Sequence, residues 1–162
     1  RMNASFLANQ LIAEGKREKG LQVLDKVYKN ISEKSYPYGY DYSGYLLAST
    51  FYRAGEIQKG AEITRKILSS SEKNLLWIAS LSDNSRMAMG DGAAQHYSIL
   101  QSLAQSAFEA KDTVTTNAIV TKVKTLFEGN AKLREYWKPV RERTAEANRH
   151  RLTMNSDSEI EL

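Results

Sequence analysis

The sequence repeats itself at a shift of 40 residues, and this repeat constrains the fold more than any other feature. The two copies have matching residue types at the positions where a helical hairpin restricts the choice of residue. The matching pairs are Leu7 and Leu47, Ala8 and Ala48, Leu11 and Phe51, Ile12 and Tyr52, Gly15 and Gly55, Gly20 and Gly60, Val23 and Ile63, and Val27 and Ile67. Self-similarity at a fixed period of roughly 20–50 residues is typical of stacked repeats. We therefore expect each copy to be one unit of a stack.

Each copy has the spacing of two helices joined by a tight turn. The residues at 7, 8, 11 and 12 form one helical stripe, and those at 20, 21, 23, 24, 27 and 28 form a second. Gly15 and Gly55 lie between the stripes, where glycine ends a helix in the left-handed conformation at little cost. Gly20 and Gly60 fall just inside the second helix. Glycine costs about 1 kcal/mol there relative to alanine, so these two residues predict a close approach between helices.

A weaker third copy follows at a shift of 96 residues from the first. Its apolar positions are Ala104, Ala107, Phe108, Ile119, Val120 and Val123. Lys111 and Asp112 replace the turn glycine in this copy. Either Asp112 or Thr113 is expected to cap the helix that follows, because short polar side chains accept hydrogen bonds from the first helical N–H groups.

The pattern predicts an all-α fold, namely an α-solenoid of antiparallel hairpins with about seven or eight helices. A single repeat domain is expected over 1–149, followed by a polar tail at 150–162. Within the domain we expect hairpins at about 3–31, 42–70 and 93–128, an extra helix at about 71–82 that Ser71 caps, a loop at "MGDGAA", and a capping helix at about 131–148. Leu133, Tyr136, Trp137 and Val140 give that last helix an apolar stripe, and Pro139 is expected to kink it.

Composition narrows the possible chemistry. The absence of cysteine excludes disulfides, thiolate catalysis and cysteine-ligated zinc. No apolar run approaches the roughly 18 residues of a membrane-spanning helix, so a soluble segment is expected, with no membrane insertion of its own. The net charge of +4 comes largely from 131–151, which is typical of a solvated amphipathic helix, and no nucleic-acid partner is predicted. The first residue is Arg1, which we interpret as the start of a segment excised from a larger protein.

These residues resemble the tetratricopeptide (TPR) repeat family. The features in common are a small residue, a large apolar residue, a glycine, then "EKG" or "QKG" and a second apolar stripe, over 4–31 and 44–70. The period of 40 exceeds the roughly 34 residues usual in the family. The extra residues fall in "SEKSYPYGYDYSGY", and the family's terminal proline is missing. The resemblance implies a TPR-like fold that binds proteins.

The order of motifs is also similar to one particular group of proteins. The "RMN" entry, the "PYGYDYSGY" bridge, the "LLWIASLS" helix and the "LQSLAQSAFEAKD" hairpin resemble the soluble C-terminal region of large bacterial membrane proteins related to protein O-mannosyltransferases of the GT-C type. This resemblance covers Arg1 to about Glu128. It implies an extracytoplasmic, periplasmic domain tethered to a membrane glycosyltransferase whose catalytic acids lie elsewhere in the parent. A cytoplasmic location stays open.

Five of the nine tyrosines fall within ten residues, which makes this segment the most unusual in the chain: Tyr36, Tyr38, Tyr40, Tyr42 and Tyr45. Aromatic rings with hydroxyl groups suit the binding of a peptide segment or a glycan. The alternative interpretation is that they fill the enlarged gap between two hairpins.

A second group of candidate binding residues comes from the TPR resemblance, which implies that the first helix of each hairpin lines a concave groove. The residues at the groove positions are Ser5, Asn9, Ser49, Tyr52 and Arg53. Asn9 matches an asparagine that some members of the family use to hold a peptide carboxylate. The remaining residues of that clamp do not match, and an ordinary surface asparagine is the alternative.

No arrangement of residues in the sequence indicates catalysis, a cofactor or a metal. His96 and His150 lack carboxylate neighbours at ligand spacing and are expected to be exposed to solvent. Trp77 and Trp137 lie on apolar stripes and are expected in the core. We therefore expect a non-catalytic interaction or scaffolding module that binds a protein, a peptide segment or a glycan. The alternative is a structural or self-association domain that stabilises its parent.

Overall fold

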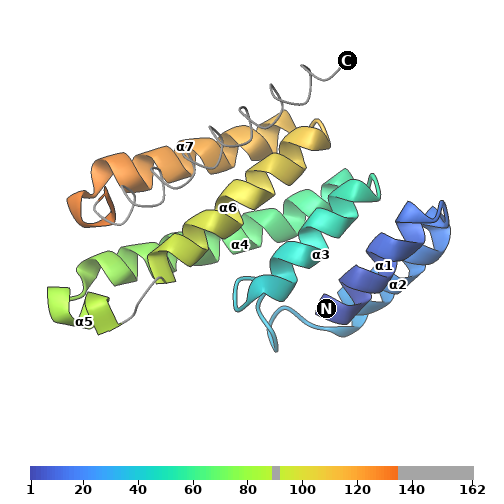
Figure 1. Cartoon of the computed structure of the whole chain (residues 1–162), viewed down its shortest axis with the longest axis horizontal. Helices are drawn as coiled ribbons and strands as arrows, with labels where there is room; N and C mark the ends of the chain where they lie inside the picture. Colours follow the sequence, from blue (N-terminus) through green and yellow to red (C-terminus); the bar gives the residue numbers. More distant parts are fainter. Residues whose placement is uncertain (89–91, 135–162) are drawn as a thin grey trace, which may run out of the picture.

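The computed structural model describes residues 1–88 and 92–134, and all regular secondary structure in these residues is helical (Figure 1). This confirms the predicted all-α fold. The helices of the described part are α1 (Met2–Ala13), α2 (Arg17–Asn30), α3 (Tyr42–Arg53), α4 (Ile57–Ser80), α5 (Asp83–Ala88), α6 (Gly92–Glu109) and α7 (Thr113–Gly129). A further helical turn covers 131–134.

The helices pair into three antiparallel hairpins, α1 with α2, α3 with α4 and α6 with α7, that share one turn geometry. The residue that ends the first helix is left-handed in each, with φ of +77° at Gly15, +80° at Gly55 and +62° at Lys111. The next N–H group then donates to the carbonyl five residues back, at 2.8 Å from Lys16 to Leu11 in the first hairpin. The same bond measures 2.9 Å from Glu56 to Phe51 and 2.9 Å from Asp112 to Ala107. The backbone hydrogen bonds of this turn satisfy carbonyl groups at the end of the first helix. The turns of all three hairpins therefore have the same conformation.

The predicted close approach at the two helix-interior glycines is confirmed. A Cβ on Gly20 would lie 3.0 Å from Ile12 Cγ1, and a Cβ on Gly60 would lie 2.9 Å from the ring of Tyr52. Ile12 and Tyr52 occupy matching positions in the two copies. Glycine therefore lets the second helix of each hairpin press against a large side chain of the first.

Neighbouring hairpins lie side by side in chain order (Figure 1). The first helices form the links, because α3 contacts α1 and α6 contacts α3. The most deeply buried apolar side chains run through all three hairpins: Leu24, Leu47, Phe51, Ile63, Leu75, Leu100, Leu103, Ile119 and Leu133. One continuous core thus connects the three hairpins.

The predicted helix boundary at Ser71 is wrong, because α4 continues without a break for 24 residues. No glycine or proline interrupts the chain between Gly60 and Ser80, and the apolar stripe stays in phase from Ile63 to Ile78. Ser71 is buried inside this helix and caps nothing. Since α4 is twice as long as α3, its second half runs beyond the start of α3 and packs against α6 and α7.

Other expected boundaries hold only in part. The short helix α5 was not predicted, and Gly92, expected in the loop "MGDGAA", begins α6. Residues 89–91 of that loop lie outside the described part of the chain. Of the predicted capping helix, 131–134 is described and helical, with Leu133 fully buried. Tyr136, Trp137, Pro139, Val140, His150 and the polar tail lie outside the described residues.

Trp77 is also placed differently from the prediction, since 52% of it is exposed to solvent. The last turns of α4 contact other helices through Leu75, Ile78 and Ala79, which are buried. Leu76 and Trp77 project from the opposite side of the same helix. Five consecutive apolar residues cannot all face one neighbouring helix, and the tertiary contacts decide which of them are buried.

Candidate binding surface

The connection between α2 and α3 carries the tyrosine cluster and is packed tightly onto the hairpins. A Cβ on Gly44, in the first turn of α3, would lie only 1.9 Å from the carbonyl oxygen of Tyr38. A Cβ on Gly39 would lie 2.6 Å from Ser70 Oγ on α4. The backbone of the connection therefore approaches both helices more closely than any other residue type allows. Tyr38, at its centre, is only 3% exposed.

Arg1 holds the same connection from the other side. Its guanidinium carbon lies 4.3 Å from the ring centroid of Tyr38 and 4.9 Å from that of Tyr36, distances typical of cation–π contacts. The guanidinium also donates to the carbonyl of Pro37 at 3.2 Å and to that of Tyr36. Burial raises the pKa of Tyr38, so its hydroxyl stays protonated at physiological pH. Tyr38 thus serves packing.

Other members of the cluster face outward. Tyr40 is 74% exposed and Tyr42 is 45% exposed. The Tyr40 ring lies 5.4 Å from that of Tyr36, and the Tyr42 ring lies 4.7 Å from that of Tyr45. The Tyr36 hydroxyl donates to Asp41, whose carboxylate also accepts from the backbone of Ser43 and caps α3. The cluster is therefore divided between packing residues and an outward aromatic surface.

Three of the five predicted groove residues are not presented to solvent as expected: Ser5 and Asn9, and also Tyr52, which lines a cavity between α3 and α6. Ser5 is fully buried where α1 meets α3, and its hydroxyl has no hydrogen-bond partner. Asn9 is partly buried, and its amide donates to Thr50 Oγ1 at 2.9 Å across the same contact. The small residues Ser5 and Ala8 allow α1 and α3 to approach directly, which closes the groove at these positions.

The remaining groove residues come together in a small polar cavity between α3 and α6. Its volume is about 270 Å³, and Ser49, Tyr52 and Arg53 from α3 face Ser106, Glu109 and Ala110. The hydroxyls of Ser106 and Ser49 lie 3.2 Å apart. Arg53 is exposed and forms no ion pair with any residue of the described chain. The cavity therefore combines hydroxyl groups, a cation and a carboxylate.

Tyr52 forms the floor of this cavity and is only 4% exposed. Its hydroxyl donates to Asp112 Oδ2 at 3.0 Å, and burial raises the pKa of Tyr52 to about 12. Burial alone would raise the pKa of Asp112, but hydrogen bonds from Thr115 and Tyr52 outweigh it, and the net shift is downward. Asp112 also caps α7 by accepting from the Thr115 N–H at 3.0 Å, as one of the two predicted caps. Tyr52 thus ties α3 to the third hairpin.

The candidates on α3 share one face of the helix. Tyr42, Tyr45, Ser49 and Tyr52 follow one another at spacings of three or four residues, and Arg53 lies four residues after Ser49. At about 1.5 Å per residue, this stripe extends for roughly 16 Å. Its first end is aromatic and its second end is polar, next to α6. The tyrosines and the groove residues were predicted separately as candidates, and the helix joins them into one surface, which we call the α3 stripe.

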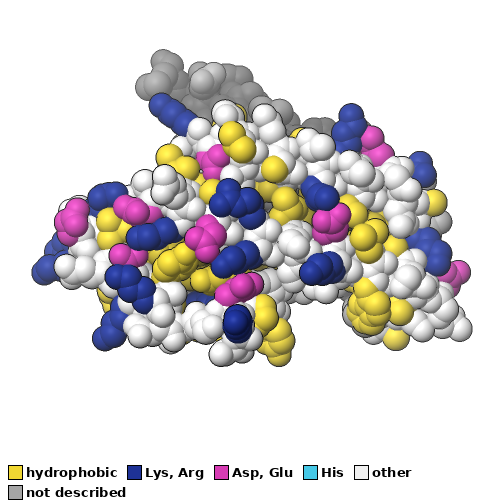
Figure 2. All heavy atoms as spheres, turned by 180° about the vertical axis from the view of Figure 1, so that it is seen from behind, with side chains coloured by type: hydrophobic (Ala, Val, Ile, Leu, Met, Phe, Trp, Pro, Cys, Tyr) yellow, Lys and Arg dark blue, Asp and Glu magenta, His cyan; other side chains and the backbone are white. Residues whose placement is uncertain are grey.

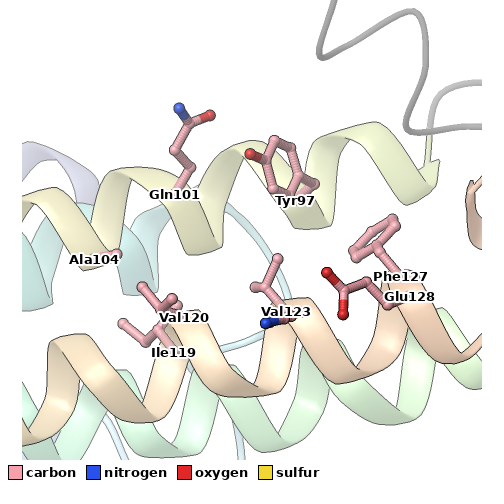
Figure 3. Close-up of a pocket in the computed structure, with 9 residues that line it drawn as sticks. Tyr97, Gln101, Ala104, Ile119, Val120, Val123, Phe127 and Glu128 are labelled. Atoms are coloured by element: carbon pink, nitrogen blue, oxygen red, sulfur yellow. The ribbon is translucent and has the colours of Figure 1, made fainter.

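A larger cavity of about 460 Å³ lies between α6 and α7 (Figure 3). In Figure 3 the side chains of Val120 and Val123 rise from α7 toward α6, where Gln101 and Tyr97 stand above them. The Tyr97 and Phe127 rings meet edge to face with centroids 5.8 Å apart. The apolar pattern did not predict this cavity, because apolar residues on a helical stripe are expected to pack in the core.

The face of the molecule opposite to the view of Figure 1 carries many charged side chains, with Lys and Arg interspersed with Asp and Glu (Figure 2). Polar and charged side chains also pair between hairpins. Lys59 lies 2.8 Å from Asp25, Lys122 lies 2.8 Å from Glu72, and the Tyr28 hydroxyl donates to Glu62 at 2.8 Å. Exposed pairs contribute only about 0–1 kcal/mol each to stability. Their main effect is to favour one alignment of neighbouring hairpins over others.

The expectation that His96 is exposed is wrong. His96 is partly buried, with Nδ1 3.2 Å from Ser71 Oγ and Nε2 3.3 Å from Asn74 Nδ2. Burial lowers the pKa of His96, so its imidazole is neutral at physiological pH. Ser71 is only 1% exposed, which keeps its hydroxyl away from any substrate. This polar cluster joins α4 to α6.

None of the helices in the described residues is long and apolar enough to cross a membrane. Within the same residues, no three His, Asp or Glu side chains are placed so that they could hold a metal ion. No family model, no curated protein and no solved structure matches the chain.

Proposed function

We propose that this chain is a non-catalytic interaction module, and that it holds an extended segment of a partner protein along the α3 stripe. The observation that carries the proposal is the alignment of Tyr42, Tyr45, Ser49, Tyr52 and Arg53 on one face of α3. Tyrosines bury a large area on binding and lose little side-chain entropy, and their hydroxyls can still hydrogen-bond. Arg53 adds an exposed cation at the other end of the stripe.

The chemistry of the stripe defines the segment that fits it. Apolar or aromatic groups suit the end formed by Tyr40, Tyr42 and Tyr45. An acidic group suits the end where the Arg53 guanidinium has no acidic partner among the described residues. A glycan is a second candidate for the aromatic end, because sugars stack on exposed rings.

The test is a selection of displayed peptides against the chain, followed by binding measurements with three variants. Tyr42→Ala and Arg53→Ala should each weaken the selected peptides about tenfold, because removing a central aromatic or arginine anchor costs about 1–2 kcal/mol. Arg65→Ala removes another exposed cation, from α4, and is the matched control. Melting temperatures should stay close to that of the parent chain. Equal weakening by Arg65→Ala, or unchanged binding after both stripe substitutions, would contradict the proposal.

A second candidate function is structural, with the chain packing against its parent or against another copy. It is favoured by the exposed apolar side chains of α1, where Met2 is 40%, Phe6 is 56% and Leu7 is 50% exposed. Leu7 matches Leu47, which the preceding hairpin buries completely. Leu7→Asp would reveal this function in sedimentation velocity, where a concentration-dependent dimer of the parent chain should disappear. A monomer at all concentrations would remove self-association from consideration.

The resemblance to the C-terminal regions of O-mannosyltransferase-related membrane proteins supports an extracytoplasmic location beside a membrane glycosyltransferase. In that setting the α3 stripe would hold an acceptor protein near the enzyme. The sequence encoded immediately before Arg1 tests this, since the proposal requires several hydrophobic spans there. A leaderless cytoplasmic domain in that position would contradict it.

A further inference from the structure

The second helices of neighbouring hairpins face each other twice in this chain, and the repeat allows the two contacts to be compared. The first contact lies between α2 and the start of α4, and the second lies between α4 and the start of α7. A groove of about 420 Å³ opens at the second contact, and we call it the α4–α7 groove. Its lining includes Ile57, Ala61, Arg65, Asp112, Val114 and Thr115.

Charged side chains bridge the first contact. Asp25 Oδ1 lies 2.8 Å from Lys59 Nζ. A guanidinium nitrogen of Arg17 lies 3.5 Å from Glu56 Oε1, and Arg17 Nε donates to the backbone carbonyl of Ala54 at 2.6 Å. Since the two members of each pair come from different hairpins, these contacts span the space between α2 and α4.

Neither bridge is retained in the α4–α7 groove. By the repeat, Arg17 and Glu56 correspond to Ile57 and Asp112, and Asp25 and Lys59 correspond to Arg65 and Thr115. An isoleucine cannot pair with an aspartate, and an arginine cannot form an ion pair with a threonine. The groove is therefore open where the equivalent contact of the first two hairpins is bridged.

Exposed aliphatic side chains border the groove. Ile57 is 41% exposed at the start of α4, and Val114 is 76% exposed in the first turn of α7. The most buried lining residues are small, since Ala61 is 6% and Thr115 is 3% exposed. Ligand sites of about 300–1,000 Å³ typically combine apolar walls with a few placed polar groups. The groove therefore has room for an aliphatic side chain of a ligand.

The groove also holds a cation that the fold leaves without a partner. Arg65 is exposed and forms no hydrogen bond or ion pair with any described residue. The two carboxylates of the groove are already engaged, because Glu62 lies 2.9 Å from Lys66. Asp112 accepts from the Tyr52 hydroxyl at 3.0 Å and caps α7, where the positive end of the helix dipole offsets its charge. The guanidinium donors of Arg65 are therefore available to a ligand.

We propose that the α4–α7 groove binds a segment of a partner protein in which an aliphatic residue adjoins an aspartate or a glutamate. The aliphatic side chain packs between Ile57 and Val114. The carboxylate accepts hydrogen bonds from the Arg65 guanidinium, whose fork matches the two carboxylate oxygens. Because the α3 stripe lies on a first helix and this groove lies between second helices, the groove is a separate site that does not depend on the function proposed for the stripe.

The experiment uses the full chain, labelled with nitrogen-15, and two pools of synthetic peptides. Each blocked hexapeptide of the first pool contains a leucine or isoleucine next to an aspartate or glutamate, and in the second pool a lysine replaces the acid. The acidic pool should shift the backbone amide resonances of Ala61, Val114 and Thr115, and the lysine pool should not. Peptides held by the α3 stripe shift Tyr45 and Ser49 instead, so a failure of one site is distinguishable from a failure of the other.

Two substitutions and one control test the contacts. Arg65→Ala should weaken the binding of the acidic peptides about tenfold, as the loss of an arginine anchor does. Arg53→Ala removes an exposed cation of α3 and is the matched control, which should leave binding in the groove unchanged. Ile57→Arg places an arginine next to Asp112, as Arg17 lies next to Glu56, and should block the groove although it adds a positive charge. Melting temperatures close to that of the parent chain show that the variants are folded.

Several results would overturn the proposal. The groove amides would not shift with the acidic pool at millimolar concentration, or would shift equally with the lysine pool. Unchanged binding by Arg65→Ala, or tighter binding by Ile57→Arg, would assign any attraction to net charge instead of the groove. If the same amides shifted on dilution of the chain without peptide, the groove would be occupied by a second copy.

Discussion

At the scale of single residues, Gly44 shows how the tyrosine connection is held in place. A methyl group on this residue would lie 1.9 Å from the carbonyl oxygen of Tyr38, which is backbone and cannot rotate away. Gly44→Ala should therefore lower the free energy of unfolding by about 3 kcal/mol, the upper range for overpacking. Urea denaturation measures this loss.

The control for that substitution is Gly129→Ala in the last turn of α7. A Cβ there would meet no atom within 4 Å, and alanine favours a helix by about 1 kcal/mol over glycine. It should be neutral or stabilising. If Gly44→Ala were equally harmless, the connection between α2 and α3 would not be packed as described.

His96 gives stability a dependence on pH. Burial lowers its pKa in the folded chain, whereas the unfolded chain has the ordinary value of about 6.5. As the pH falls below about 6.5, the unfolded state binds the proton first, so stability is lost toward the lower pKa of the folded state. Urea midpoints at neutral and mildly acidic pH should differ more for the parent chain than for His96→Asn. An identical difference in both proteins would exclude this role.

At the scale of elements, the third hairpin turn departs from the first two in one residue. Lys111 adopts a φ of +62°, which glycine occupies in the other turns. A non-glycine residue in this conformation costs about 1–2 kcal/mol, while glycine adds entropy to the unfolded chain. Lys111→Gly should therefore stabilise the chain by about 1 kcal/mol in thermal or urea unfolding.

Lys16→Gly is the matched control for the turn, because Lys16 follows Gly15 and has an ordinary φ of −92°. Relief of strain is not expected there, and the substitution should be neutral or destabilising. A gain in stability from Lys16→Gly equal to that from Lys111→Gly would assign the effect to charge instead of backbone conformation.

The helices themselves were largely predictable because their determinants are short in range. Apolar spacing, a turn glycine and a capping aspartate act within a few residues, and they predicted the ends of α1, α3 and α7 to within a few positions. The helix start predicted at Ser71 is wrong because a serine caps the N-terminus of a helix only where the preceding residues are not helical. Nothing local to Ser71 ends α4, and its hydroxyl contacts His96 instead.

At the scale of the whole molecule, stability depends on contacts between hairpins. Phe51 is fully buried, and its ring meets Tyr28 of the preceding hairpin. Phe51→Ala should cost about 3–5 kcal/mol, as large core truncations do. Hydrogen exchange should accelerate in α2 as well as in α3, because the loss falls on the contact between them.

Phe108→Ala provides the comparison. Phe108 lies on α6 and is 65% exposed, so its truncation should lower the free energy of unfolding very little. If Phe51→Ala weakened protection in α3 alone, the hairpins would be independent units. The continuous core of buried residues predicts the opposite.

The sequence by itself determined the all-α class, the hairpin units and the turns, because period, glycine and capping chemistry are properties of neighbouring residues. Only the tertiary structure decided which side of each helix faces another. That choice buried Ser5 and Tyr38, partly buried His96 and exposed Trp77, none of which their residue types predict. It also joined two separately predicted groups of candidates along α3 and formed a cavity of about 460 Å³ between α6 and α7. The burial of a side chain depends on residues that are distant in the sequence. A single helix with a broad apolar stripe can pack against other helices in several orientations.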